Sequence, residues 1–429
     1  MNMATKLNLN YNMRMLKNRK DSKFLDSRQF ALRLRVFTIV FFCLVLSSCT
    51  GQDQSRIRNN KQKLVLGADR TNKYLPLLKG KKVGIIANPT SVVNSVHLVD
   101  TLLSLQVDIR CVFAPEHGFR GEAEAGETVV AGVDSKTGVK VFSLYGDHKK
   151  PTAESLKGIE ILVFDIQDVG ARFYTYINTL QYVMEAAATY KLPLIVLDRP
   201  NPNGYYVDGP VMTDKKLYSF VGQLPIPIVH GCTLGELAEM ISGEGWLSGG
   251  KSCELTVIPC SDYTHNSYFE LPIKPSPNLP NITSIYAYPS LCWFEGTCIS
   301  IGRGTDLPFQ QFGFPNCKVG ETTFTPKEIP GVSTNPPFEN QLCKGAKVSF
   351  EKRPTQLNLS WLISMYSNYP NKDKFFTSAN FFDKLAGTTQ LRKQIIGGVG
   401  EDVIRLSWQS DLDAYKAIRK KYLLYTDFN

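Results

Sequence analysis

The sequence predicts an α/β protein with a doubly wound parallel sheet, followed by a second, smaller α+β domain. Two observations carry this prediction. In the first half of the chain, short apolar runs rich in β-branched residues alternate with amphipathic stretches of helical periodicity. The runs lack the apolar–polar alternation of a half-exposed strand, so we expect strands buried on both faces. A repeated strand–helix order is typical of doubly wound α/β domains.

The expected elements of the first half are placed by their periodicity. Strands are expected at four continuous apolar runs, at residues 82–87, 109–114, 159–164 and 192–197. Helices are expected at 95–105 and at 176–190, where apolar residues recur at helical spacing. Thr233 and Glu236 have the spacing of a capping box and predict a further helix start.

The second half is less regular, and we expect the smaller domain to begin near residue 250. Residues 274–280 are rich in proline and predict an extended loop, while 356–366 and 381–399 have helical character. The expected organisation is therefore a catalytic domain at 64–250 and an α+β domain at 251–429, with the site in the cleft between them.

Composition and charge narrow the range of partners. Of the 429 residues, 43% are hydrophobic and 21% are charged, values that exclude a wholly disordered chain. The formal net charge is +10, but +7 of it falls within residues 1–48. The remaining chain gives little reason to expect a nucleic-acid partner.

The N-terminus has the pattern of an export signal. Basic residues precede an apolar run at 36–46, which as a helix would span about 16 Å and is too short for a bilayer core of about 30 Å. The ending Leu46-Ser47-Ser48-Cys49 resembles the bacterial lipobox, in which the signal is cut before an acylated cysteine. We therefore expect a lipoprotein signal peptide at 1–48, a polar tether at 49–63 and a lipid anchor at Cys49 in the cell envelope, on the periplasmic side or the outer membrane. A plain secretory signal with a chance cysteine is the alternative.

Polar, glycine- and proline-rich loops follow each of the four expected strands, at 88–90, 115–121, 165–174 and 198–204. Ligands of an open parallel sheet bind outside the carboxyl ends of its strands. Four such loops in succession, with carboxylates in two of them and a Glu-His pair in a third, predict a functional site at this edge.

Several of these segments together resemble the exo-acting β-N-acetylmuramidases, a bacterial family long known only as a domain of unknown function. They occur in order at 116–121 (EHGFRG), 165–176 (DIQDVGARFYTY), 198–202 (DRPNP), 230–231 (HG), 275–280 (PSPNLP) and 293–306. The resemblance implies a glycoside hydrolase that removes β-1,4-linked N-acetylmuramic acid from the non-reducing end of peptidoglycan fragments. It also implies a Rossmann-like first domain and no nucleotide cofactor.

Glycosidic bond cleavage usually needs two carboxyl groups. Glu116 is the first candidate for the acid/base, because it follows a buried strand and is expected to be partly desolvated. His117 is expected to tune Glu116, to bind substrate or to relay protons. The candidates for the partner carboxylate are Glu295, ranked first because it follows two aromatic residues, and then Asp168 and Asp165. The spacing of Asp168 and Arg172 also fits a local salt bridge.

Further residues are candidates for substrate binding. A site that selects muramic acid should bind its lactyl carboxylate with a cationic side chain. The candidates are Arg120, Arg172, Arg199 and Arg303. The aromatic candidates for sugar stacking are Phe173, Tyr174, Tyr176 and Trp293. Amide candidates for hydroxyl or acetamido groups are Asn88, Asn201 and Asn278.

Two other classes of function remain open from the sequence. A non-catalytic muropeptide-binding lipoprotein would also have two lobes and a cleft, and a metal-dependent hydrolase would use His117, Asp165 and Asp168. No histidine pair has metal-ligand spacing, no CxxC–His pattern predicts zinc, and no strand is followed by GxGxxG. We therefore expect no metal and no cofactor. Candidate disulfide pairs in an exported chain are Cys253 with Cys260 and Cys292 with Cys298.

Overall fold

The computed structural model describes residues 64–120 and 132–428. The expected signal peptide at 1–48 and the tether at 49–63, which includes Cys49, lie outside the described residues. Within the part of the chain that is described, no helix is both long and apolar enough to cross a bilayer.

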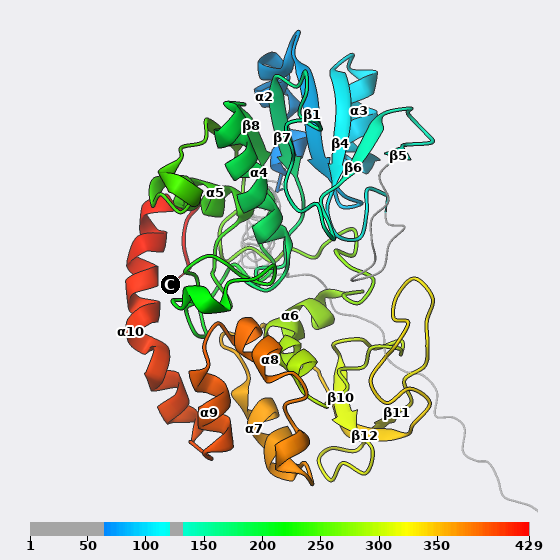
Figure 1. Ribbon diagram of the computed structural model, residues 1–429, viewed down its shortest axis with the longest axis vertical. Coiled ribbons are helices and arrows are strands. Elements are labelled where there is room, and N and C mark those ends of the chain that lie inside the picture. Colours follow the sequence, from blue (N-terminus) through cyan, green and yellow to red (C-terminus); the bar gives the residue numbers. More distant parts are fainter. Residues whose placement is uncertain (1–63, 121–131, 429) are drawn as a thin grey trace, which may run out of the picture. The chain divides into compact units, whose positions relative to one another are not determined.

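A seven-stranded sheet forms the centre of the first lobe, in the order β5-β6-β4-β1-β7-β8-β9 (Figure 1). All its strands are parallel except β5, which pairs antiparallel with β6. Numbered in chain order, the parallel strands lie in the order 3-2-1-4-5-6, which confirms the predicted doubly wound sheet. The strand bounds are β1 Lys82–Ala87, β4 Asp108–Ala114, β5 Gly132–Val133, β6 Lys140–Ser143, β7 Ile161–Asp165, β8 Leu194–Leu197 and β9 Leu255–Ile258.

Helices cover both faces of this sheet, which is why its strands are continuous apolar runs. In β7, Leu162 and Phe164 belong to a cluster with residues of α4 (Tyr176–Tyr190) and α5 (Leu234–Gly243). Ile161 and Val163 belong to a second cluster, with residues of α2 (Thr71–Leu78) and α3 (Leu98–Ser104). Successive side chains of a strand point to opposite faces, so each face of β7 meets its own helix pair.

The predicted helix at 176–190 is confirmed over its full length, whereas the one at 95–105 is shorter than expected. Residues Val96–His97 form the short strand β3, which pairs with β2 (Val92–Val93), and α3 begins only at Leu98. The His97 side chain accepts a hydrogen bond from the Val99 N–H and so caps the helix at this point.

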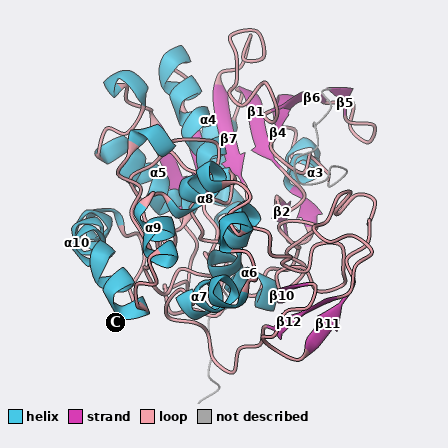
Figure 2. Cartoon of the chain, turned by 60° about the horizontal axis from the view of Figure 1, so that its bottom comes forward, coloured by secondary structure: helices cyan, strands magenta, loops and turns pink. Residues whose placement is uncertain are grey.

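The second lobe contains a three-stranded antiparallel sheet and a group of helices (Figure 2). Its strands lie in the order β10-β12-β11, with bounds Gln311–Phe314, Cys343–Lys347 and Thr322–Phe324. Its helices are α6 Ile282–Leu291, α7 Leu359–Asn368, α8 Ala379–Ala386, α9 Gln390–Ile396 and α10 Glu401–Arg419. The large sheet continues past residue 250, the expected start of the second domain, because β9 pairs with β8.

One hydrophobic cluster joins the two lobes. It contains Phe164 and Leu180 of the first lobe together with Phe312 and Leu362 of the second. The region 381–399 is divided between α8 and α9, because Gly387 ends α8 in a left-handed conformation (φ 75°). A Cβ atom at Gly387 would lie 2.5 Å from the Arg172 guanidinium, so glycine also meets a packing requirement there.

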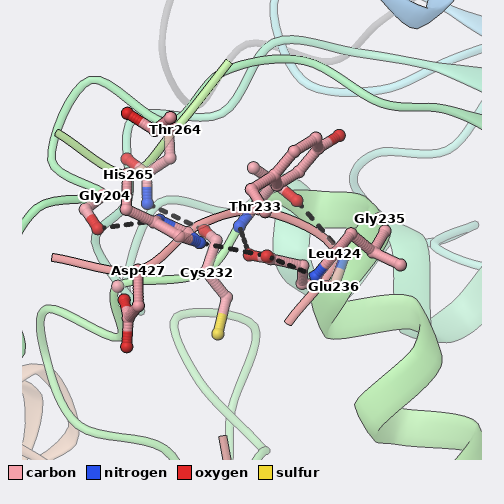
Figure 3. A network of polar contacts seen from close by, with 12 residues as sticks. Gly204, Cys232, Thr233, Gly235, Glu236, Thr264, His265, Leu424 and Asp427 are labelled. Atoms are coloured by element: carbon pink, nitrogen blue, oxygen red, sulfur yellow. Dashed lines mark hydrogen bonds and ion pairs between the residues drawn. The ribbon is translucent and has the colours of Figure 1, made fainter. Parts of the chain in front are cut away.

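The C-terminal segment after α10 binds to the first lobe through a buried polar network (Figure 3). The Leu424 N–H donates to Glu236 Oε1 at 2.9 Å, and Nε2 of the buried His265 lies 3.0 Å from the same oxygen. The Thr233 N–H donates to Glu236 Oε2, and Thr233 Oγ1 accepts from the Glu236 N–H, which confirms the predicted capping box. The network therefore fixes the end of the chain to the N-terminus of α5.

Candidate active site

A cavity of about 400 Å³ lies at the carboxyl edge of the large sheet and is also lined by the second lobe. Residues after β4, β6 and β7 line it on one side, and residues after α6 and on α8 line it on the other. The lining residues are Glu116, His117, Tyr145, Phe173, Tyr174, Thr175, Phe220, Val221, Ser276, Asn278, Leu279, Tyr288, Cys292, Glu295, Arg303, Phe309, Phe381 and Leu385.

Glu116 is held on a tight turn directly after β4. The Gly118 N–H donates to the Pro115 carbonyl at 3.1 Å and closes the turn. His117 has a φ of 69° at the position of such a turn that usually requires glycine or asparagine. A buried histidine in a left-handed conformation is a strained feature, and strain of this kind is concentrated at functional sites.

The Glu116 carboxylate receives hydrogen bonds from hydroxyl groups of other segments. Thr175 Oγ1, directly before α4, donates to Glu116 Oε2 at 2.7 Å. The Tyr145 hydroxyl is hydrogen-bonded to the same carboxylate, and burial together with the charge of Glu116 raises the pKa of Tyr145. The Tyr176 hydroxyl lies 3.4 Å from the Glu116 carbonyl oxygen and supports the turn rather than lining the cavity.

Glu295 enters the cavity from the second lobe, on the short 3₁₀ helix η4 (Cys292–Gly296). Arg303 Nη2 and Nε donate to Glu295 Oε1 at 2.5 and 3.1 Å, and Cys292 Sγ lies 3.8 Å from Oε2. The Arg303 guanidinium also lies over the Phe309 ring, 5.1 Å from its centre. The carboxylate is therefore part of an ordered ion pair that faces the cavity.

Aromatic and amide side chains form most of the remaining wall. Tyr174 contacts Tyr288 edge to face at 5.8 Å, and its hydroxyl donates to the Pro275 carbonyl at 2.7 Å. Asn278 is almost fully buried, and its Nδ2 donates to the Val332 carbonyl at 2.8 Å. Its Oδ1 has no hydrogen-bond partner among the described residues.

Two predicted acidic residues lie outside this cavity. Asp165 is completely buried at the end of β7 and forms a bidentate ion pair with Arg199, with distances of 2.6 and 2.9 Å. Asp168 accepts a hydrogen bond from the Gly170 N–H at 2.6 Å and lies 3.8 Å from His230. Both carboxylates therefore stabilise the loop after β7 instead of lining the cavity.

The predicted salt bridge between Asp168 and Arg172 is wrong. The buried Arg172 guanidinium donates instead to the backbone carbonyls of Pro210, Ile226 and Leu385, and burial lowers its pKa to about 9. These three carbonyls come from distant segments, so Arg172 joins loops of the first lobe to the end of α8.

Other predicted binding residues also have structural partners away from the cavity. Arg120 forms ion pairs with Asp100 and Asp134 at 2.9 and 2.8 Å. Trp293 is completely buried in the shared core. The Asn88 side chain accepts hydrogen bonds from Thr90, and the Asn201 side chain donates to the Cys232 carbonyl. The Tyr176 hydroxyl bonds the backbone carbonyls of Glu116 and Pro275.

Several lining residues were missed in the sequence. Thr175 and Ser276 lie inside two of the recognised segments, so the segments could have indicated them. Tyr145, Phe220 and Phe381 lie in regions without a motif, and the sequence carries no local signal for them.

All eight cysteines of the described chain are free, so the candidate pairs Cys253–Cys260 and Cys292–Cys298 are not formed. Among residues 64–120 and 132–428, no three His, Cys, Asp or Glu side chains gather in a way that could hold a metal ion.

Comparison with known proteins covers nearly all of the described chain. Residues 83–283 match the N-terminal, and 286–425 the C-terminal, model of the family described as exo-β-N-acetylmuramidase NamZ. The chain is 39% identical to the peptidoglycan β-N-acetylmuramidase NamZ of Bacillus subtilis (strain 168), over 90% of this chain and 97% of that protein.

Two crystal structures of DUF1343 family proteins from Bacteroides fragilis NCTC 9343 have the same fold. One is 48% identical, with a TM-score of 0.78 over 85% of this chain and 100% of its own. The other is 30% identical, with a TM-score of 0.75 over 85% of this chain and 99% of its own. By sequence and by fold, this chain belongs to the exo-β-N-acetylmuramidase family.

Proposed function

We propose that this protein is an exo-β-N-acetylmuramidase, which hydrolyses the β-1,4 bond of non-reducing-end N-acetylmuramic acid in peptidoglycan fragments during cell-wall turnover. The observation that carries the proposal is that Glu116 and Glu295, from different lobes, line one cavity. The name and the 39% identity of the Bacillus subtilis relative support the same substrate class.

The chemistry assigns a role to each carboxylate. Glu116 protonates the glycosidic oxygen and later deprotonates water, as the acid/base of a glycosidase does. Glu295 is the second carboxylate, and its ion pair with Arg303 at 2.5 Å supports a negatively charged side chain beside the sugar ring. His117 adjoins Glu116 on the turn and also lines the cavity.

The cavity wall also fits the groups that distinguish muramic acid. Among the described residues that line the cavity, Arg303 is the one Lys or Arg. We therefore assign its guanidinium to the lactyl carboxylate of the substrate. The Asn278 carboxamide oxygen lacks a partner in the described structure and is assigned to the acetamido N–H of the substrate. A volume of about 400 Å³ lies near the lower end of small-molecule sites and favours one terminal sugar over a long glycan.

The test compares hydrolysis of a β-linked chromogenic N-acetylmuramoside with that of the glucosaminide that lacks the lactyl group. We expect release from the muramoside and at least tenfold less from the glucosaminide. Glu116→Gln is expected to keep substrate binding and lose turnover. Tight binding without release by the unaltered protein would instead identify the muropeptide-binding lipoprotein.

We further propose that the protein is exported and anchored to a membrane of the cell envelope through Cys49. The support is the basic and apolar signal pattern that ends in Leu46-Ser47-Ser48-Cys49. Metabolic labelling with a palmitate analogue should label the full chain in bacterial cells and leave Cys49→Ala unlabelled. Equal labelling of the two chains would contradict the anchor.

A further inference from the structure

Thr175 directly precedes α4 with helical backbone angles (φ −67°, ψ −14°), and its side chain makes no capping hydrogen bond. A capping side chain reaches the first turn of its helix from an extended backbone, which Thr175 does not have. Here Thr175 Oγ1 donates to Glu116 Oε2 at 2.7 Å instead. The Thr175 hydroxyl therefore bonds a carboxylate on another segment and no backbone group of its own helix.

The contact joins two separately anchored parts of the first lobe. Glu116 lies on the turn after β4, and Thr175 precedes the 15-residue helix α4, so 59 residues separate them in sequence. Both side chains line the cavity. A β-branched side chain has few rotamers, so the helix start holds the hydroxyl in a defined direction.

We propose that Thr175 is a positioning residue for Glu116, an inference that rests on the proposed function and adds a residue to its machinery. A hydroxyl can donate to a carboxylate and can also accept from a carboxylic acid. Thr175 therefore holds Glu116 both before and after it transfers its proton. Valine has the same shape and can do neither.

The nearby Thr179 provides a matched control on the same helix. It is buried, its hydroxyl bonds the Thr175 carbonyl at 3.4 Å and no other group of the described residues, and it does not line the cavity. Thr179→Val therefore removes a buried hydroxyl from α4 without touching Glu116. A comparison of Thr175→Val with Thr179→Val separates positioning from a general effect on the helix.

The experiment measures kcat and KM on the chromogenic muramoside. Thr175→Val is expected to lower kcat about 10- to 100-fold with KM changed less than about twofold, because a misplaced catalytic group slows the chemical step. Thr175→Ser should restore kcat, and Thr179→Val should leave kcat and KM unchanged.

A kcat for Thr175→Val equal to that of Thr179→Val would overturn the inference, as would a loss of kcat that serine does not rescue. Thermal melts establish that each variant is folded, and Thr175→Ala replaces the valine variant should that one not fold. Glu116→Gln in the same assay keeps the two proposals apart. If it abolishes turnover while Thr175→Val does not alter it, only the positioning role fails; if the unaltered protein is inactive, the proposed function and this inference both fail.

Discussion

Replacement of Arg303 by methionine should reduce the preference for muramic acid over glucosamine. Arg303 Nη2 lies 2.5 Å from Glu295 Oε1, and the guanidinium is the cation assigned to the lactyl carboxylate. The two side chains are each 23% exposed, so the local dielectric is intermediate, and unit charges 4 Å apart would interact by about 4 kcal/mol at most. Because Glu295 already shares the guanidinium, we expect about 2 kcal/mol for the lactyl contact.

This energy corresponds to a loss of about 30-fold in kcat/KM on the muramoside relative to the glucosaminide. The assay determines kcat/KM on both chromogenic substrates for the unaltered protein and for Arg303→Met. Arg303→Lys is the matched control, since it keeps the charge but loses the planar fork, and we expect an intermediate preference. An equal loss on both substrates would refute the reasoning, because it would mean that Arg303 acts only by holding Glu295.

Three further changes test other parts of the structure. Glu116→Gln should lose turnover on the chromogenic muramoside, where water must still be deprotonated, and should lose more on natural disaccharides, whose leaving group must also be protonated; equal losses would contradict its role as the acid. Arg199→Met should lower the free energy of unfolding by about 3–5 kcal/mol in denaturant titrations, because it leaves the fully buried Asp165 carboxyl without its ion-pair partner; a loss under 1 kcal/mol would contradict this. Burial raises the pKa of Asp198 from 3.8 to about 6, so the folded state binds a proton more tightly than the unfolded chain. Its stabilising contribution, complete below pH 4, should be lost as the pH rises through 6, a change of about 3 kcal/mol that Asp198→Asn removes. Parallel stability curves for the two proteins from pH 4 to 7 would contradict that assignment.

The elements whose signal is local were predictable from the sequence. The apolar runs at β1, β4, β7 and β8, the helix α4 and the capping box of α5 all follow from periodicity or short-range spacing. The position of Glu116 was predictable for the same reason, because the end of a buried strand places it at the carboxyl edge of the sheet.

The partners of the charged residues could not be predicted in this way. Four arginines had similar motif positions, yet only Arg303 lines the cavity, while Arg120, Arg172 and Arg199 bind carboxylates or backbone carbonyls elsewhere. The choice depends on which acceptors lie within reach after packing, and Arg172 has an acceptor 213 residues away in Leu385.

By itself, the sequence determined the doubly wound sheet, the edge of the sheet at which the candidate site lies, and the carboxylate on the turn after β4. These features follow from local sequence patterns, because such patterns indicate which strands are buried and in which direction the chain runs. Only the tertiary structure decided which other carboxylate lines the cavity with Glu116 and which hydroxyls hold Glu116. Glu295, Tyr145 and Thr175 reach that cavity from segments far apart in the chain, and packing of the two lobes alone brings them together.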